Sequence, residues 1–413
     1  MLLFFFRSKR TRRKVMNVAR SNHFRRFEWN KMKFKYFAVL FSAFSSGLVQ
    51  AEPSVVVYGM IDLGARYSSG LSLSATSSPA TNASNTESLA SGVDRSGRFG
   101  LAGSEDLGAG YKSVFTLESD LYANTGNVNV NTGAGKDASS ANTNKLFERQ
   151  ALVGLVAPFG SVLLGRQQNV LRDIIDDIDA VDGRFSSFNP NLQYTALNSS
   201  GLVASSATYY GTGNPGNDSM MRQDNAVKFI HQSGPVSSTV LHSFGGVSGS
   251  TASGASTQAS LAYRQGGLFL AGAYQTMNND NDTLKLNAYA IGGRYVINDW
   301  QIRVSYGSNT ADRTTTTKIK TDIYAIGTTY SATPALDLTL GYYKVNRTWS
   351  ADIKPNAAID RVIGFAEYKL SKRSLVFLEI DRNRWGGDST QFQGNALNKP
   401  TTTGLTLGVD HRF

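Results

Sequence analysis

Most of the chain alternates apolar and polar residues with a period of two. From Glu52 onward, short alternating stretches are separated by connections rich in Gly, Ser, Thr and Asn. Because successive side chains of a strand point to opposite sides of a sheet, this pattern predicts strands with one oily and one wet face. In the last stretch one face carries Leu405, Leu407, Val409 and Phe413, and the other carries Thr406, Gly408, Asp410 and Arg412.

About sixteen such strands are predicted. An even number is what single-chain bacterial barrels contain, and lengths of mostly 9 to 13 residues match the ~9 to 11 that a tilted strand needs to cross a bilayer. The predicted strands lie near residues 55–67, 97–106, 111–121, 146–157, 161–168, 222–232, 235–244, 256–264, 268–277, 284–297, 300–308, 321–331, 336–345, 360–370, 374–384 and 402–413.

The connections fall into two classes that alternate. Tight turns contain Gly, Pro or Asn, as at Gly108-Ala109-Gly110 and Gly234-Pro235, whereas long polar loops cover Ser68 to Arg95, Tyr122 to Lys145 and Asn309 to Lys320. Short turns alternating with long loops are typical of an all-β, antiparallel, up-and-down transmembrane barrel. A soluble β-sandwich shares the period of two, but its apolar faces point inward and its connections lack this rhythm.

The net charge resides in the leader. The chain has 413 residues, 42 basic and 31 acidic, for a formal charge of +11, and no Cys. Without the twelve bases and the single acid, Glu28, of residues 1–51, 30 basic and 30 acidic residues remain. A neutral body gives no basis for a nucleic-acid partner, and without Cys no disulfide framework holds the chain together.

Residues 32–51 have the layout of a secretory signal peptide. A short basic head, Met32 to Lys35, precedes an apolar run, Tyr36 to Val49, and a small-residue cleavage site that ends at Ala51. Residues 1–31 are then either an upstream extension or the product of a mis-assigned start codon. The apolar run falls short of the ~20 residues that a membrane-spanning helix needs. We expect export through the periplasm and a mature domain of residues 52–413.

Six segments within residues 52–413 resemble Gram-negative trimeric porins, and in particular the general porins of β-proteobacteria. The resemblance implies a sixteen-stranded barrel in the outer membrane, in contact with lipid and lipopolysaccharide and assembled as a homotrimer. It also implies a third long loop folded into the lumen, passive diffusion of ions and small hydrophilic solutes, and a terminal aromatic, Phe413, that serves as an assembly signal. The segments are Val57–Asp62, Ser96–Gly108, Phe147–Leu155, Phe159–Gln167, Asp224–Phe229 and Gly408–Phe413.

Strand parity predicts which residues face the channel. Phe99 and Leu101 face lipid, which turns Arg98 toward water, and assigning Leu152 to the outer face turns Arg149 inward. The predicted basic lining is Arg98, Arg149, Arg222, Lys112 and Arg66; the other lumen residues are Tyr58, Asp62, Glu118, Asp120, Asp224 and Lys228.

The longest stretch without strand signals, residues 169–221, is the constriction loop by resemblance, and a loop this long is usually functional. The resemblance then implies that its carboxylates face Arg98, Arg149 and Arg222 across the narrowest part of the pore. Opposed charges in a narrow pore orient water and discriminate ions. The alternative is a solvated acidic surface. The resemblance favours anions, whereas so many aspartates depart from it, and the sign of selectivity stays open. The aspartates are Asp173, Asp176, Asp177, Asp179 and Asp182.

Arg166 departs from the expected pattern because it shares its predicted face with Val162 and Leu164, which places a charge toward lipid. Two explanations remain open. Either Arg166 reaches the headgroup level, or a loop of an adjacent subunit covers it, for which Tyr122 to Lys145 is the candidate.

No cofactor, metal or enzymatic activity is expected. Gly211–Gly216 fits a dinucleotide fingerprint as text but has no strand before it, and neither clustered metal ligands nor a nucleophile elbow is present. Two alternatives to general diffusion remain. One is a substrate-selective channel or a loop-mediated adhesin on the same barrel. The other, a hydrolase on a barrel scaffold, requires a Ser–His pair at hydrogen-bonding distance.

Overall fold

The computed structural model describes residues 54–69, 85–128, 146–184, 196–197, 203–204, 222–279, 281–312, 315–316, 318–349, 357–387 and 401–413. The chain divides into two units, Met1–Val49 and Gln50–Phe413. The first unit lies outside the described residues, and so does the whole of the predicted signal peptide.

The second unit is almost entirely strand. Its one described helix is α1 (Val170–Ile178). The strands are β1 (Ser54–Ser69), β2 (Thr86–Ser91), β3 (Arg98–Gly108), β4 (Tyr111–Asp120), β5 (Gln150–Ala157), β6 (Gly160–Gln168), β7 (Ala196–Leu197), β8 (Val203–Ala204), β9 (Arg222–Ser233), β10 (Val236–Ser243), β11 (Ser256–Gln265), β12 (Leu268–Asn278), β13 (Lys285–Ile297), β14 (Trp300–Asp312), β15 (Lys318–Ser331), β16 (Leu336–Trp349), β17 (Ala357–Lys369), β18 (Ser374–Gly387) and β19 (Thr401–Arg412).

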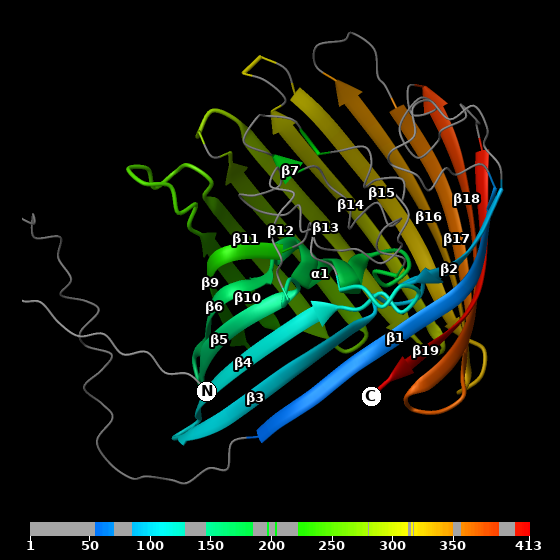
Figure 1. Cartoon of the computed structure of the whole chain (residues 1–413), viewed down its shortest axis with the longest axis horizontal. Coiled ribbons are helices and arrows are strands. Elements are labelled where there is room, and N and C mark those ends of the chain that lie inside the picture. The colour runs from blue at the N-terminus through cyan, green and yellow to red at the C-terminus, as the bar shows by residue number, and fades with distance from the viewer. Residues whose placement is uncertain are drawn as a thin grey trace, which may run out of the picture. The chain divides into compact units, whose positions relative to one another are not determined.

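The strands form a closed antiparallel barrel with sixteen positions (Figure 1). Each strand pairs with its neighbours in the sequence, β6 pairs with β9, and β1 pairs with β19 to close the ring. β2 and β3 share one position, since the first half of β1 pairs with β3 and the second half with β2. Closure leaves no free sheet edge, as a sheet that spans a bilayer requires.

All sixteen predicted strands are present at the predicted places. Three predicted loops contain more structure than the sequence suggested. β2 lies within the loop predicted for Ser68 to Arg95, the connection from Asn309 to Lys320 is shortened by extension of β14 and β15, and α1, β7 and β8 lie within residues 169–221. β2 is ordered by pairing with the second half of β1, and β7 by pairing with β8. Pairs this short leave no period in the sequence.

The outer face of the barrel is apolar. On six consecutive strands, β12 to β17, one large apolar side chain is between 46 and 58% exposed, whereas its neighbours along the strand point inward and are mostly buried. The predicted stripe Leu405, Leu407 and Val409 is likewise exposed, and Thr406 and Asp410 are buried. This arrangement excludes a soluble sandwich, whose apolar faces would be covered. The six residues are Leu270, Ile291, Val304, Ile326, Leu340 and Val362.

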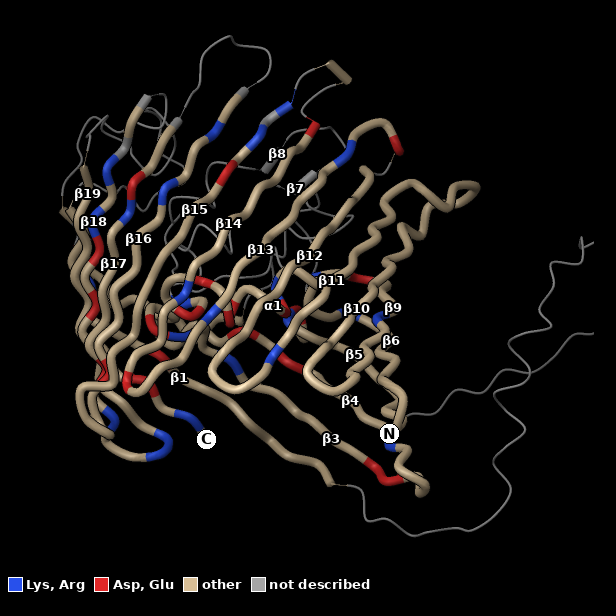
Figure 2. The backbone as a smooth tube through the Cα atoms, turned by 180° about the vertical axis from the view of Figure 1, so that it is seen from behind, with Lys and Arg blue, Asp and Glu red and all other residues tan. Residues whose placement is uncertain are grey.

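Among the described residues, no helix has the length and apolar character that would carry it across a membrane. α1 lies between the wall of β1, β3 and β4 and the opposite wall of β12 to β14, as views from opposite sides show (Figures 1 and 2).

Candidate functional site

The segment Asn169–Arg184, which contains α1, is the described part of the predicted constriction loop. The side chain of Asn169 caps the helix by accepting a hydrogen bond from the backbone amide of Arg172, 2.8 Å away. An amide oxygen at this position satisfies one of the free N–H groups at a helix start. α1 is amphipathic, and its apolar face packs on inward-facing residues of β12 and β13. The helix contributes Val170, Leu171, Ile174, Ile175 and Ile178, and the wall contributes Ala271, Ala273, Leu286, Ala288 and Ala290.

Glycines in the wall let the segment approach the sheet closely. A Cβ on Gly327 would lie 1.9 Å from the carbonyl oxygen of Ala180, and one on Gly341 would lie 2.5 Å from Val181. Gly327 and Gly341 are direct cross-strand partners on β15 and β16. A glycine inside a strand often marks such a close approach of backbone. The wall is therefore shaped for the residues that follow α1.

Basic residues of the wall pair with Asp173, Asp177 and Asp182 of the segment, and acidic and basic stretches of the chain lie close to α1 in Figure 2. Asp173 accepts from Lys228 at 2.7 Å, and Asp177 lies 2.6 Å from Arg264 and 2.7 Å from Arg294.

Farther along the segment, Asp182 lies 2.6 Å from Arg95 and 3.4 Å from Arg303. Asp179 is buried and accepts from the hydroxyl of Tyr343, whereas Asp176 pairs within the segment with Arg172. Four of the five aspartates thus connect the segment to other parts of the barrel, and Asp176 pairs within it.

The guanidinium of Arg149 has partners other than those the sequence suggested. It donates to Glu118 at 2.6 Å and to Asp120 at 2.5 Å, and its side chain is 1% exposed. Arg222 is fully buried, whereas Arg98 is partly exposed with one nitrogen 3.9 Å from the sulfur of Met60. Of the three, Arg222 interacts electrostatically with Asp173 of Asn169–Arg184.

The prediction from strand parity that Leu152 lies on the outer face is wrong. Leu152 is the cross-strand partner of Thr116, two residues from Glu118, and therefore shares the polar face. Val153 is the outward residue, 56% exposed. Arg149 nevertheless contacts Glu118, because β5 begins only at Gln150 and Arg149 is free of the strand's alternation.

A second charged cluster escaped the sequence reasoning. Arg66 donates to Glu379 at 2.7 Å, to Asp381 at 2.6 Å and to Thr406 at 2.9 Å, and all four residues are buried. The outward parity of Leu378 and Ile380 could have identified both acids as inward-facing residues.

The other predicted lumen residues occupy varied settings. Tyr58 donates to Glu118 at 2.9 Å. Asp62 faces inward but is fully covered by the backbone of residues 92–95. Lys112 is exposed beside the β3–β4 turn, opposite Asp106, at the rim of the barrel and away from the segment.

Arg166 is covered by its own chain, which corrects the expectation of a bare charge facing lipid. Its side chain is 7% exposed, lies 2.6 Å from Asp224 and donates to the backbone carbonyl of Glu148. The register of β6 and β9 shifts between Gly165 and Gln167, and Gly165 has a φ of +121°. This bulge breaks the alternation from which the outward position was inferred.

Phe413 lies across the barrel seam. Its backbone amide and carbonyl each form a 3.1 Å hydrogen bond with Gly59, and a Cβ on Gly59 would lie 2.3 Å from its ring. The C-terminal aromatic thus fills the place that a side chain on Gly59 would take.

A Ser–His pair is present, on the outside of the barrel. Ser374 Oγ and His411 Nδ1 lie 2.8 Å apart between cross-strand partners of β18 and β19, and the contact is exposed. Within the described residues, the His411 ring has no hydrogen bond to an acidic side chain, which is the third group that orients the histidine of a hydrolase triad.

Comparison with known proteins places this barrel in a family. A family model described as Gram-negative porin matches residues 38–388. The chain belongs to the Gram-negative porin family. This porin is an outer-membrane protein of the Gram-negative cell, and its barrel is a diffusion channel.

Individual relatives share between about a fifth and a third of their aligned residues with this chain. An outer membrane porin protein of Bordetella pertussis is 32% identical over 166 residues, 39% of this chain and 40% of the relative. The major outer membrane protein P.IA of Neisseria meningitidis serogroup A is 23% identical over 350 residues, 76% of this chain and 80% of the relative. An anion-selective porin from Comamonas acidovorans has a similar fold, with a TM-score of 0.66 at 19% identity, covering 88% of this chain and all of that one.

Proposed function

We propose that the segment Asn169–Arg184 narrows this porin's channel and sets the size limit for passive passage of ions and small hydrophilic solutes. The observation that carries the proposal is the packing of α1 on inward-facing residues of β12 and β13. A helix on the inner face takes up cross-section that water would otherwise fill.

We further propose that the channel discriminates weakly between anions and cations. Each aspartate of the segment has a nearby partner that offsets its charge or donates a hydrogen bond to it, as with Asp173 and Lys228 or Asp177 and its two arginines. Closely paired opposite charges leave only a dipole field, and salt screens that field further, with a Debye length of about 8 Å at physiological ionic strength. The field that a passing ion feels is therefore short in range.

A reversal-potential measurement in a potassium chloride gradient tests the sign and strength of selectivity. The expected reversal potential is small, and purified protein in planar bilayers is expected to insert as stepwise conductances. A reversal potential close to the full chloride Nernst value would instead show a strongly anion-selective pore, as the name of the Comamonas porin states for that protein.

The homotrimer also belongs to the proposal, and it rests on the resemblance of the six motifs. Conductance steps in groups of three and a trimeric mass in detergent are expected. Because Arg166 is buried within its own chain, we propose that the trimer does not depend on this residue as a latch. A monomeric mass would remove the assembly proposal but leave the channel.

A substrate-selective channel or an adhesin remains the second prediction for the long loops. Residues 70–84 and 129–145 lie outside the described residues. Saturable block of the conductance by one sugar or anion would favour a selective channel over general diffusion.

A further inference from the structure

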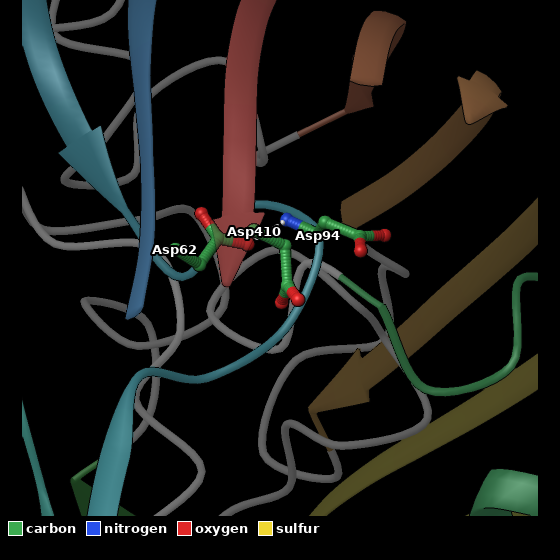
Figure 3. Close-up of side chains that lie close together, drawn as sticks. All are labelled: Asp62, Asp94 and Asp410. Carbon is green, nitrogen blue, oxygen red and sulfur yellow. Dashed lines mark hydrogen bonds between the residues drawn. The ribbon is translucent and has the colours of Figure 1, made fainter. Parts of the chain in front are cut away.

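Three buried carboxyl groups meet at the seam that closes the barrel. Asp62 is on β1, Asp410 is on β19, and Asp94 lies in the connection Gly92–Gly97 between β2 and β3 (Figure 3). One carboxylate oxygen of each residue lies within 4.8 Å of the other two. The residues are 0, 1 and 0% exposed for Asp62, Asp410 and Asp94.

The arrangement places three carboxyl groups close together in a buried setting. Asp62 and Asp410 are direct register partners in the β1–β19 pair. Like charges directly opposite each other in a sheet are destabilising, and burial strengthens the repulsion because less solvent screens it. Something must offset this charge in the folded protein.

Asp62 is fixed as a hydrogen-bond acceptor. Its Oδ1 accepts the backbone amides of Gly92 and Val93 at 3.2 Å, and its Oδ2 accepts those of Asp94 and Arg95 at 2.7 and 2.6 Å. Both oxygens of the Asp62 carboxyl group are therefore occupied as acceptors of backbone N–H donors. They also fold the connection Gly92–Gly97 over it.

The other two carboxylates retain open acceptor positions within the described part of the chain. Neither oxygen of Asp410 accepts a hydrogen bond, and its contact is an ion pair from Oδ1 to Nε of Arg412 at 3.5 Å. Neither oxygen of Asp94 accepts one, and only its Oδ1 lies near a cation, 3.1 Å from Nε of Arg184. Buried carboxylate oxygens without donors are rare in folded proteins and point to an unseen partner.

The arginines near the three carboxyl groups also have other partners or are exposed to solvent. Arg184 is shared with Glu367, Arg95 is bound to Asp182, and the side chain of Arg412 is half exposed to solvent. Three carboxylates thus outnumber the cations that touch them.

We propose that Asp62, Asp94 and Asp410 bind a divalent cation of the calcium class. Calcium takes oxygen ligands at 2.3–2.6 Å, so two oxygens on opposite sides of the ion are about 4.6 to 5.2 Å apart. Magnesium, with bonds of 2.0–2.1 Å, would require oxygens no farther apart than about 4.2 Å. The three carboxylates, each offering one ligand atom within 4.8 Å of the other two, supply the oxygen ligands that calcium takes.

A cation there would join three parts of the chain that are far apart in sequence. It would link the first and last strands to Gly92–Gly97, and that connection reaches the segment Asn169–Arg184 through Arg95 with Asp182 and Asp94 with Arg184. Calcium would therefore stabilise both the closure of the barrel and the seat of the segment. This role is separate from diffusion through the channel.

The test uses the whole mature protein refolded in detergent, free of lipopolysaccharide, and stripped with EGTA. Calorimetric titration with calcium chloride is expected to show a single site per chain, and calcium is expected to raise the unfolding temperature. Asp410→Asn and Asp94→Asn each remove one charged ligand at nearly constant shape, and we expect them to weaken binding roughly tenfold or more. Magnesium is expected to bind more weakly than calcium.

Asp106→Asn is the matched control, since Asp106 is an exposed carboxylate at the β3–β4 turn. It should leave calcium binding unchanged. The gel mobility of unheated protein reports whether each variant folds as a barrel. Absence of calcium binding by the parent protein, or equal weakening by Asp106→Asn and Asp410→Asn, would overturn the proposal. The proposal would also be overturned if Asp410→Asn were more stable than the parent in EGTA and the parent did not respond to calcium. A proton shared among the carboxyl groups would then account for the cluster.

Discussion

The hydroxyl of Tyr343 on β16 lies 2.9 and 3.0 Å from the two carboxylate oxygens of Asp179, the residue that ends α1. Both residues are buried, and 164 positions of sequence separate them. Asp179 also accepts the backbone amides of Val181 and Gly183. The carboxylate of Asp179 therefore stabilises the turn after α1 and connects this turn to β16.

Tyr343→Phe is expected to loosen the segment without opening the barrel. The substitution leaves a buried carboxylate short of one donor, which costs roughly 1–3 kcal/mol. We expect larger or noisier single-channel conductance. Tyr342→Phe is the matched control, because the hydroxyl of Tyr342 binds Asp360 at 2.6 Å on the exposed side of the barrel. Equal conductance in both variants would show that this hydrogen bond does not hold the segment in the channel.

Gly327→Ala is expected to displace the residues after α1. The new Cβ would lie 1.9 Å from the carbonyl oxygen of Ala180, a distance at which the backbone must move. The expected result is a raised conductance and a larger size limit for solutes, measured by liposome swelling with sugars of increasing mass. Gly272→Ala, where the nearest atom is 3.8 Å away, should change neither. An unaltered size limit in the Gly327 variant would contradict the close seat of the segment.

Arg149→Ala and Arg98→Ala are expected to differ in stability while both shift selectivity toward cations. Arg149→Ala leaves Glu118 and Asp120 buried without their counter-ion, and breaking a buried pair in this way costs about 3–5 kcal/mol. Arg98 is partly exposed and its loss should be less costly. Reversal potentials and thermal unfolding of the two variants provide the comparison. Unchanged reversal potentials in both would mean that neither side chain lines the pore.

Acidification is expected to release the segment through Asp182. Burial by itself would raise the pKa of this carboxyl group, but the charges of Arg95, Arg184 and Arg303 outweigh burial and lower the pKa below its ordinary value of 3.8. The stabilisation is therefore complete above pH 3.8 and is lost as the pH falls through the lower pKa of the folded state. Conductance should change at that lower pH. At neutral pH, Asp182→Asn should already show the conductance that the parent protein shows at low pH. If the conductance of this variant still changed at the pH of the parent's transition, the transition would belong to another group.

The order and positions of the sixteen strands were predictable, because alternation is a local property and lipid outside with water inside imposes it on every strand. The outward stripe of Leu405, Leu407 and Val409 follows directly from that rule. Where alternation was interrupted, the same rule failed. The bulge at Gly165 turned Arg166 onto Asp224, and the start of β5 at Gln150 freed Arg149 from the parity of Leu152.

What only the tertiary structure decided is which charges meet. The sequence supplied the aspartates of Asn169–Arg184 and the basic residues of the wall, but the pairing of Asp177 with Arg264 and Arg294 depends on how the segment crosses the sheet. The same holds for Asp62 and Asp410, which come together only because the first and last strands pair when the ring closes. Local pattern specifies the faces of each strand, whereas contacts between residues hundreds of positions apart are specified by closure and packing, which no short stretch of sequence contains.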